Sequence, residues 1–147
     1  MLFEETPIGY LMELVWRIHF LSKRAMDRDL KKLGLTYPQF GTLKALSIKE
    51  NISQKQLALF LETDTTNVMV ICDSLEKKKL IERKANPNDR RENLIARTEL
   101  GKKRFKKAML EMEAKTGAIA GQLRASEISA VLPQLEKILD FLKGDRT

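Results

Sequence analysis

Two adjacent arginines, Arg90 and Arg91, follow a turn-forming segment, where guanidinium groups can reach phosphates and base edges. Residues 86–89 read Asn-Pro-Asn-Asp, and strand-like runs lie on either side at 80–84 and 93–97. The pattern predicts a β-hairpin with the arginines at its tip. A thin ribbon of this kind can enter the narrow, electronegative minor groove of DNA, where a helix does not fit.

Helices on both sides of the hairpin are expected to position it. Thr36 with Gln39, and Ser53 with Gln56, form capping-box signatures that open a second and a third helix. A first helix is expected over residues 8–33, with Gly34 as its stop. Its apolar residues recur at helical spacing: Ile8, Leu11, Met12, Val15, Ile18, Leu21 and Leu30.

Further helices follow the same signals. Thr63 or Asp64 is expected to cap a fourth helix, Thr98 a long basic helix after the hairpin, and Ser126 the last helix. The last helix carries one apolar face: Ile128, Val131, Leu132, Leu135, Ile138, Leu139 and Leu142. The terminal helices are too apolar for a compact winged helix alone. We expect them to pack against each other and against a second copy; an intramolecular bundle is the alternative.

The fourth helix has one apolar and one mixed face. On a helical wheel Val68, Ile71, Cys72 and Leu75 gather on the core side. The opposite side presents Thr66, Val70, Asp73 and Lys77, flanked by Thr65, Asn67, Met69 and Ser74. Preceded by another short helix, this pattern is that of a helix–turn–helix whose second helix lies in the major groove.

Several of these outward residues can read DNA. Asn67 is suited to adenine, Thr65 and Thr66 to bases or phosphate, and Met69 or Val70 to thymine methyl groups. Packing of Met69 and Val70 on a neighbouring helix is the alternative. Lys77 adds a positive charge on the same side.

Two further groups complete the predicted interface. Asp73 has the wrong sign for a face turned toward phosphates, and we expect Arg83 to neutralise it. Ser53, Gln54 and Lys55 begin the preceding helix, where free backbone N–H groups suit a phosphate.

Positive charge is concentrated around the hairpin. Residues 77–107 hold 13 Lys and Arg against 4 Asp and Glu, although the whole chain has a net charge of only +7. A localised patch of this kind is typical of a face that binds a polyanion, although a Lys-rich helix surface alone would be an ordinary solvated face.

Composition argues against other classes of protein. The 147 residues are 43% hydrophobic, without the run of roughly 18 apolar residues that a membrane span needs. The chain has one histidine, His19, and one cysteine, Cys72, too few for a His/Cys zinc site or a disulfide. Neither a phosphate-binding glycine loop nor a nucleophile elbow is present. We expect no enzyme, no metal and no cofactor, and a cytoplasmic protein in which Cys72 is buried and inert.

The same residues resemble the multiple-antibiotic-resistance regulator (MarR) family of transcription factors over nearly the whole chain. The similarity includes residues 34–40, Gly-Leu-Thr-Tyr-Pro-Gln-Phe, and the helix–turn–helix at 56–58 and 68–83. Asp89-Arg90-Arg91, followed by Thr98 and Gly101, resembles the wing signature of that family.

The resemblance implies a homodimer that binds pseudopalindromic double-stranded DNA and usually represses transcription. Asp89 would orient the wing tip, Arg91 would enter the minor groove, and Arg90 would add a phosphate or groove contact. The sequence departs from the family pattern at three places. Arg97 replaces a usual Leu, making the second strand more basic, and Lys79 replaces a usual Gly before the first strand. Val70 and Ser74 stand where many members have arginine.

Members of the family often respond to a small aromatic or lipophilic effector. Aromatic and polar residues near the expected junction could form its pocket, with Arg17 as the counter-charge. These residues are Trp16, Arg17, His19, Phe20, Tyr37 and Phe40. They could equally be ordinary residues of the dimer core.

The sequence therefore predicts a mainly α protein. We expect a winged helix–turn–helix with a two-stranded β-hairpin wing and long N- and C-terminal dimerisation helices. Within a single domain of residues 1–147, residues 36–98 would bind DNA, and 1–33 with 99–147 would form the dimer. A winged-helix module for an acidic protein partner, and a non-specific DNA-binding protein without effector, are the alternatives. Binding to single strands or RNA is disfavoured because exposed aromatic platforms are missing.

Overall fold

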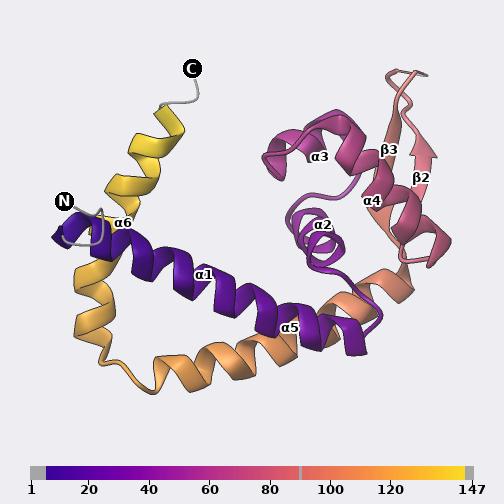
Figure 1. Cartoon of the computed structure of the whole chain (residues 1–147). Coiled ribbons are helices and arrows are strands. Elements are labelled where there is room, and N and C mark those ends of the chain that lie inside the picture. The colour runs from indigo at the N-terminus through magenta and orange to yellow at the C-terminus, as the bar shows by residue number, and fades with distance from the viewer. Residues whose placement is uncertain (1–5, 90, 145–147) are drawn as a thin grey trace. The chain divides into compact units, whose positions relative to one another are not determined.

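The computed structural model describes residues 6–89 and 91–144, which form six helices and three short strands (Figure 1). The chain divides into two compact units, residues 1–110 and 111–147, and α5 belongs to both. In chain order the elements are α1 (Pro7–Lys32), α2 (Tyr37–Ile48), β1 (Ile52–Ser53), α3 (Gln54–Phe60), α4 (Thr65–Lys77), β2 (Ile81–Ala85), β3 (Asn93–Arg97), α5 (Glu99–Ala120) and α6 (Ala125–Gly144). The mainly α fold with a hairpin wing is as predicted.

Most helices begin at the predicted caps. The capping boxes of Thr36 with Gln39 and of Ser53 with Gln56 are both complete. Asp64, and not Thr63, caps α4 by accepting a hydrogen bond from the Asn67 amide at 2.8 Å. In each case a side-chain oxygen satisfies a backbone N–H that lacks a partner within the helix.

Three helices end in the same type of turn. After α1, α3 and α4 the chain passes through a left-handed residue, namely Gly34, Glu62 and Lys79. After α4, the Lys79 and Leu80 amides donate to the Glu76 and Leu75 carbonyls at 2.8 and 2.9 Å, which defines a Schellman motif. The motif turns the chain sharply from the helix into β2, although glycine is the residue that adopts this conformation most easily.

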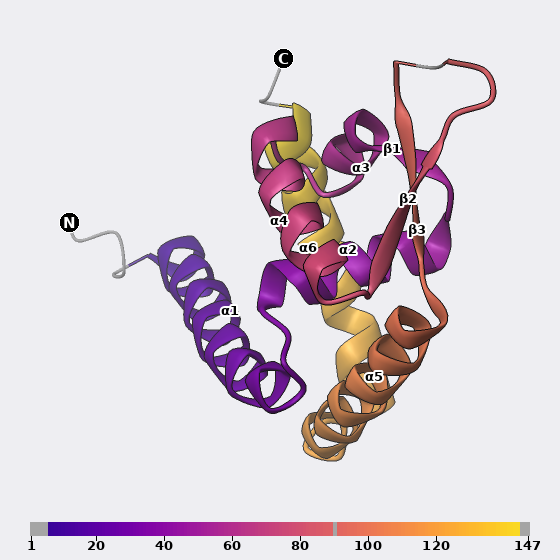
Figure 2. The ribbon, with the colours of Figure 1, turned by 90° about the vertical axis from the view of Figure 1, so that its right-hand side faces the viewer.

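The sheet has three strands, one more than the predicted hairpin. Strands β2 and β3 pair antiparallel, with Arg83 opposite Ile95, and β1 pairs with the other edge of β3, with Ile52 opposite Ile95. Because β1 has only two residues, it carries no alternation pattern that a sequence could reveal. In both views of the ribbon the hairpin extends beyond α3 and α4 (Figures 1 and 2).

The core of the first unit lies between α2, α3, α4 and the sheet. Its largest buried side chains include Leu43, Leu46, Ile52, Leu57, Val68, Leu75, Leu80, Ile81 and Ile95. The start of α5 is fixed to this core through Thr98, whose hydroxyl donates to the Lys79 carbonyl at 2.7 Å and accepts from the Gly101 amide at 3.0 Å. The core therefore holds two elements on one scaffold. These are α4, the second helix of the helix–turn–helix and hence the predicted recognition helix, and the β2–β3 hairpin, which is the predicted wing.

The second unit contains the end of α5 and all of α6. Helix α6 begins at Ala125, so Ser126 lies inside its first turn and the prediction that Ser126 caps it is wrong. Instead the Arg124 amide donates to the Glu127 carboxylate at 2.8 Å, and that interaction closes the first turn. None of the residues of α6 is buried within the chain.

Candidate nucleic-acid interface

Helix α4 presents the outward face that the sequence predicts. Val68, Cys72 and Leu75 are buried, while Ile71, placed in the core by the helical wheel, is only half-buried. The predicted DNA-facing residues of this helix are exposed: Thr65, Thr66, Asn67, Met69, Val70 and Lys77. Met69 and Val70 remain 47% and 61% exposed, so neither is part of the core, although Val70 lines a hollow of about 430 Å³ with Tyr37 and Pro38 of α2.

The amide of Asn67 has local partners. Its Nδ2 donates to Asp64 Oδ2 at 2.7 Å and to the Thr63 hydroxyl at 3.3 Å. An Asn side chain that reads adenine needs the same amide group as a donor. Contact with a base would therefore require Asn67 to exchange Asp64 for the base edge.

Predicted phosphate and groove residues from three elements line one hollow. It has a volume of about 260 Å³ and lies between the start of α3, the start of α4 and residues 91–93, where the chain returns from the wing tip into β3. Its walls are Ser53, Gln54, Lys55, Thr65, Arg91, Glu92 and Asn93. Ser53 itself is buried and its hydroxyl accepts from the Gln56 amide, so its side chain shapes the helix start.

The wing tip is ordered by its own side chains. Asp89 Oδ1 accepts from the Arg91 amide at 2.9 Å, and Asn86 Oδ1 accepts from the Asn88 amide at 3.0 Å. Such short-range bonds stabilise a tight turn. The Arg91 side chain is exposed, whereas Arg90 lies outside the described residues.

Arg83 joins the wing to the recognition helix. Its guanidinium forms an ion pair with Asp73 at 2.5 Å, as the sequence predicts, and a second one with Glu76. Burial opposes the charged form, but the hydrogen bond with Asp73 and the charge of Glu76 outweigh it and raise the pKa of Arg83. These contacts connect β2 to α4, and the Arg83 side chain that makes them is only 19% exposed.

Arg97 on β3 also points into the protein. Its Nε donates to Glu50 at 2.8 Å, and its guanidinium lies 5.5 Å from the centre of the Phe105 ring. The second strand is therefore not more basic toward solvent, because this charge is neutralised internally.

Cys72 is fully buried on the core side of α4. Desolvation raises the pKa of its thiol to about 11, although the nearby Arg83 charge acts in the opposite direction. A thiol of this kind is a poor nucleophile at neutral pH.

The six predicted effector residues fall into two groups. Tyr37 and Phe40 line a hollow of about 540 Å³, together with Met26, Gly41, Lys44, Ala45, Ile48, Phe60, Leu61 and Glu62. Trp16, Arg17, His19 and Phe20 are exposed on α1 and do not line it; the Trp16 and Phe20 rings stack 5.4 Å apart. His19 is thus not a core residue of this chain.

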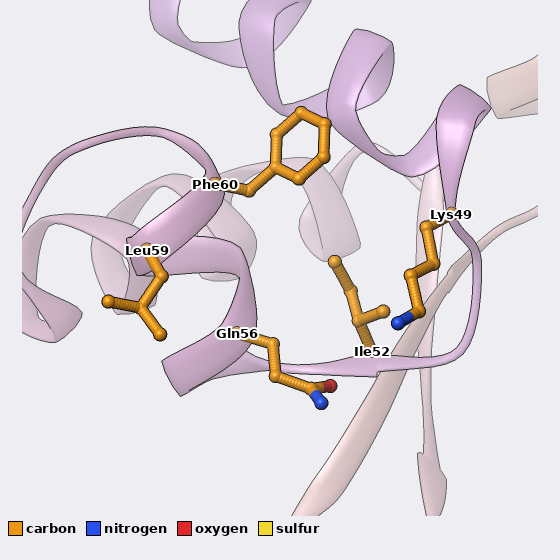
Figure 3. A pocket seen from close by; sticks show the side chains of 5 residues that line it. All are labelled: Lys49, Ile52, Gln56, Leu59 and Phe60. Carbon is orange, nitrogen blue, oxygen red and sulfur yellow. The ribbon is translucent and has the colours of Figure 1, made fainter.

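A second hollow, of about 350 Å³, lies on the other side of Phe60 (Figure 3). Its walls are Lys49, Ile52, Gln56, Leu59 and Phe60, and the Phe60 ring lies across the hollow from the Gln56 amide. None of the predicted site residues lines this hollow.

Residues 6–89 and 91–144 contain neither a helix long and apolar enough to cross a membrane nor a His, Cys, Asp and Glu cluster suited to a metal ion.

A helix–turn–helix, α3 and α4, followed directly by the β2–β3 hairpin defines a winged helix–turn–helix protein. The MarR family profile matches residues 33–92, the segment that contains these elements. This winged helix–turn–helix segment belongs to the MarR family of transcription regulators.

Similar sequences include several regulators. YdcH of Bacillus subtilis, a helix–turn–helix-type transcriptional regulator, is 36% identical over 92 residues, which cover 60% of this chain and 63% of YdcH. The transcriptional repressor MprA of Escherichia coli K12 is 33% identical over 67% of this chain and 58% of its own length. The repressor Rv2887 of Mycobacterium tuberculosis is 25% identical over 92% of this chain and 95% of its own.

Solved structures extend the similarity to the whole fold. A mutant of MarR from Escherichia coli in complex with operator DNA matches with a TM-score of 0.82 and 26% identity, over 95% of this chain and 99% of that one. A further MarR family transcription regulator matches with a TM-score of 0.88 over 93% of this chain and 91% of its own, and its 19% identity bears on the fold alone.

Proposed function

We propose that this protein is a sequence-specific, homodimeric transcriptional repressor that binds a pseudopalindromic operator. The observation that carries the proposal is the convergence of α3, α4 and the wing on one hollow, with Lys55 and Arg91 beside it. A phosphate seated there would fix the register of the protein on the duplex, α4 would read the major groove, and the wing would enter the minor groove. The repressor names of related proteins support the direction of regulation.

The interface we propose keeps the predicted residues and divides them by role. Base readers are Asn67, Met69 and Val70, with Thr65 and Thr66 contacting bases or phosphate. Phosphate and groove contacts come from Gln54, Lys55, Lys77, Arg90 and Arg91. Ser53, Arg83 and Asp89 position these groups through the bonds described above.

Apolar side chains on the terminal helices support the dimer. Trp16, Ile18 and Leu21 on α1 are 57–64% exposed, and Val131, Leu139 and Phe141 on α6 are 50–72% exposed. So much exposed apolar surface on a chain of this size favours burial against a second copy. We assign DNA binding to residues 36–98 and dimerisation to residues 1–33 and 99–147.

We further propose that a small aromatic or lipophilic effector binds the hollow lined by Tyr37 and Phe40. Its volume of about 540 Å³ suits such a molecule; its lining holds one basic side chain, Lys44, and one acidic side chain, Glu62, so Lys44 is the group that would pair with an anion. A thermal-shift panel of benzoate, salicylate and neutral benzamide tests this. Benzoate and salicylate, but not benzamide, should raise the melting temperature of the wild type, and the Lys44→Met variant should lose this response. Equal melting-temperature shifts of the wild type and the variant with every compound would count against the proposed effector site.

The protein is expected to act through binding rather than catalysis, in the cytoplasm. The direct test of DNA binding compares wild type with Arg91→Ala and Lys49→Ala, which remove one positive charge each from the same unit. Arg91→Ala should weaken binding to any duplex and reduce the log–log salt slope by roughly 1. Lys49→Ala, outside the interface, should do neither. Equal effects of the two variants would contradict the assigned wing contact, and absence of any duplex binding would favour a protein partner.

A further inference from the structure

Gln39 makes contacts beyond the cap of its own helix. It is 5% exposed at the first turn of α2, where its Oε1 accepts from the Thr36 amide at 3.1 Å. The same oxygen accepts from Lys78 Nζ at 2.8 Å, and Nε2 donates to the Ser74 hydroxyl at 2.8 Å. One buried carboxamide therefore joins the start of α2 to the last turns of the recognition helix.

Lys78 extends this link to the turn between α1 and α2. Its ammonium also donates to the Gly34 carbonyl at 2.7 Å, in the left-handed turn that ends α1. Ser74 and Lys78 are four residues apart, so both lie on the side of α4 that faces α2. Residues 34–39 thus hold the recognition helix at two points one helical turn apart.

We propose that Gln39 is a positioning residue that sets the orientation of the recognition helix and couples it to the α1–α2 turn. The inference rests on the proposed function and adds a route for its regulation. Tyr37 and Phe40, which flank Gln39 at two and one residues, line the proposed effector hollow. A molecule that displaces the first turn of α2 would move Gln39, and with it the far end of α4.

The expected consequence concerns specificity more than affinity. Base-edge contacts need the helix in one orientation, whereas charge contacts with phosphates tolerate small rotations. Without the Gln39 carboxamide, the Ser74 hydroxyl and the Lys78 ammonium each lose a partly buried hydrogen bond. That loss weakens the hold of α2 on α4. Replacement of the Gln39 carboxamide should therefore weaken binding to a specific DNA site while leaving binding to non-specific DNA nearly unchanged.

The chain offers a matched control in Gln56. Gln56 occupies the same capping-box position of α3, and its Oε1 accepts from the Ser53 amide at 3.1 Å. Gln56→Met removes the same group and the same capping bond as Gln39→Met, but not a link to α4. Comparison of the two variants separates the loss of a cap from the loss of the link.

The experiment measures the affinity of each variant for a duplex enriched from a random library and for a random duplex of equal length. Gln39→Met should lower affinity for the enriched duplex about tenfold, which corresponds to one or two hydrogen bonds, and change affinity for the random duplex less than about twofold. Gln56→Met should keep the wild-type ratio. Gln39→Glu should recover most of the ratio, because its carboxylate can accept from both Ser74 and Lys78.

Amide deuterium exchange of α4 gives a readout that does not depend on DNA. Residues 70–78 should exchange faster in Gln39→Met than in wild type or Gln56→Met. Equal exchange together with an unchanged affinity ratio would overturn the link, even if the wild type reads a specific site. If the wild type binds no duplex, the proposed function fails, and the exchange data alone decide whether Gln39 positions α4.

Discussion

Three arginines near the wing carry the same charge in different surroundings. Arg91 is exposed beside the hollow between the wing and the helix–turn–helix, whereas Arg83 binds Asp73 and Glu76, and Arg97 binds Glu50. A guanidinium with carboxylate partners gains little from a phosphate, because it must give up one partner for the other. At the scale of single residues, the surroundings of an arginine decide whether it is available to DNA.

Asn67→Ala should alter which base is preferred at one position. The side chain reaches the exposed face of α4 and is held there by Asp64. Loss of one bidentate base contact should reduce discrimination at a single step by roughly 1–3 kcal/mol, with little change elsewhere. Library selection with the variant measures this. A uniform loss at all positions would remove Asn67 from the base readers.

Cys72 should react slowly in the folded protein. With its thiol pKa raised from 9.0 to about 11, the thiolate is about a hundredfold scarcer at neutral pH, and its labelling rate should rise as pH approaches 11. Iodoacetamide labelling, followed by mass spectrometry at pH 7.5 and in urea, checks this. The double variant Cys72→Ser/Ser47→Cys, whose thiol is exposed on α2, serves as the fast control. Rapid labelling of native Cys72 that abolishes DNA binding would indicate a redox sensor.

At the scale of elements, caps and turns are the parts that local sequence could predict. Thr36, Ser53 and Thr98 each stand three residues before a partner to which they are hydrogen-bonded, so the signal lies within one short window. The contacts that the sequence could not predict join distant segments: β1 with β3, Arg97 with Glu50, and Gln39 with Ser74. Side-chain types alone do not tell which of many distant partners will meet.

Gly101 illustrates how closely α5 approaches the wing. A Cβ at this position would lie 1.9 Å from the Leu80 carbonyl oxygen, so Gly101→Ala must displace α5 from the start of β2. We expect a loss of about 2–3 kcal/mol in the free energy of unfolding. Gly117→Ala in the same helix meets nothing within 4 Å and should stabilise by about 0.5–1 kcal/mol. Urea denaturation of both variants checks this, and a stable Gly101→Ala would disprove the packing.

Lys79 occupies a position better suited to glycine. Its φ of 58° lies in the left-handed region, where a side chain costs roughly 1–2 kcal/mol. Because glycine is more flexible when unfolded, Lys79→Gly should stabilise by only about 0.5–1 kcal/mol. Lys77→Gly, at the last residue of α4, should instead destabilise by about 0.5 kcal/mol, because glycine loses more backbone freedom on folding. A fall in melting temperature for both variants would show that the strain at Lys79 is relieved in another way.

At the scale of the whole molecule, the terminal helices carry the evidence for a second copy. Exposed apolar residues of α1 and α6 follow the helical spacing that the sequence shows, so the sequence could predict that these faces need a partner. The sequence could not predict which of the six candidate effector residues lie in the same hollow. Their residue types and expected position near the junction put six residues in one group, whereas only Tyr37 and Phe40 of that group line the hollow.

The central claim is that a dimer of this chain reads a specific DNA sequence. The most direct measurement is selection from a random-duplex library by the purified protein at near-physiological salt, followed by sequencing of the retained DNA. We predict enrichment of an inverted repeat with half-site centres about one helical turn, or roughly 10 base pairs, apart. Retention of duplexes without any enriched motif would contradict sequence reading, and retention of none would contradict DNA binding itself.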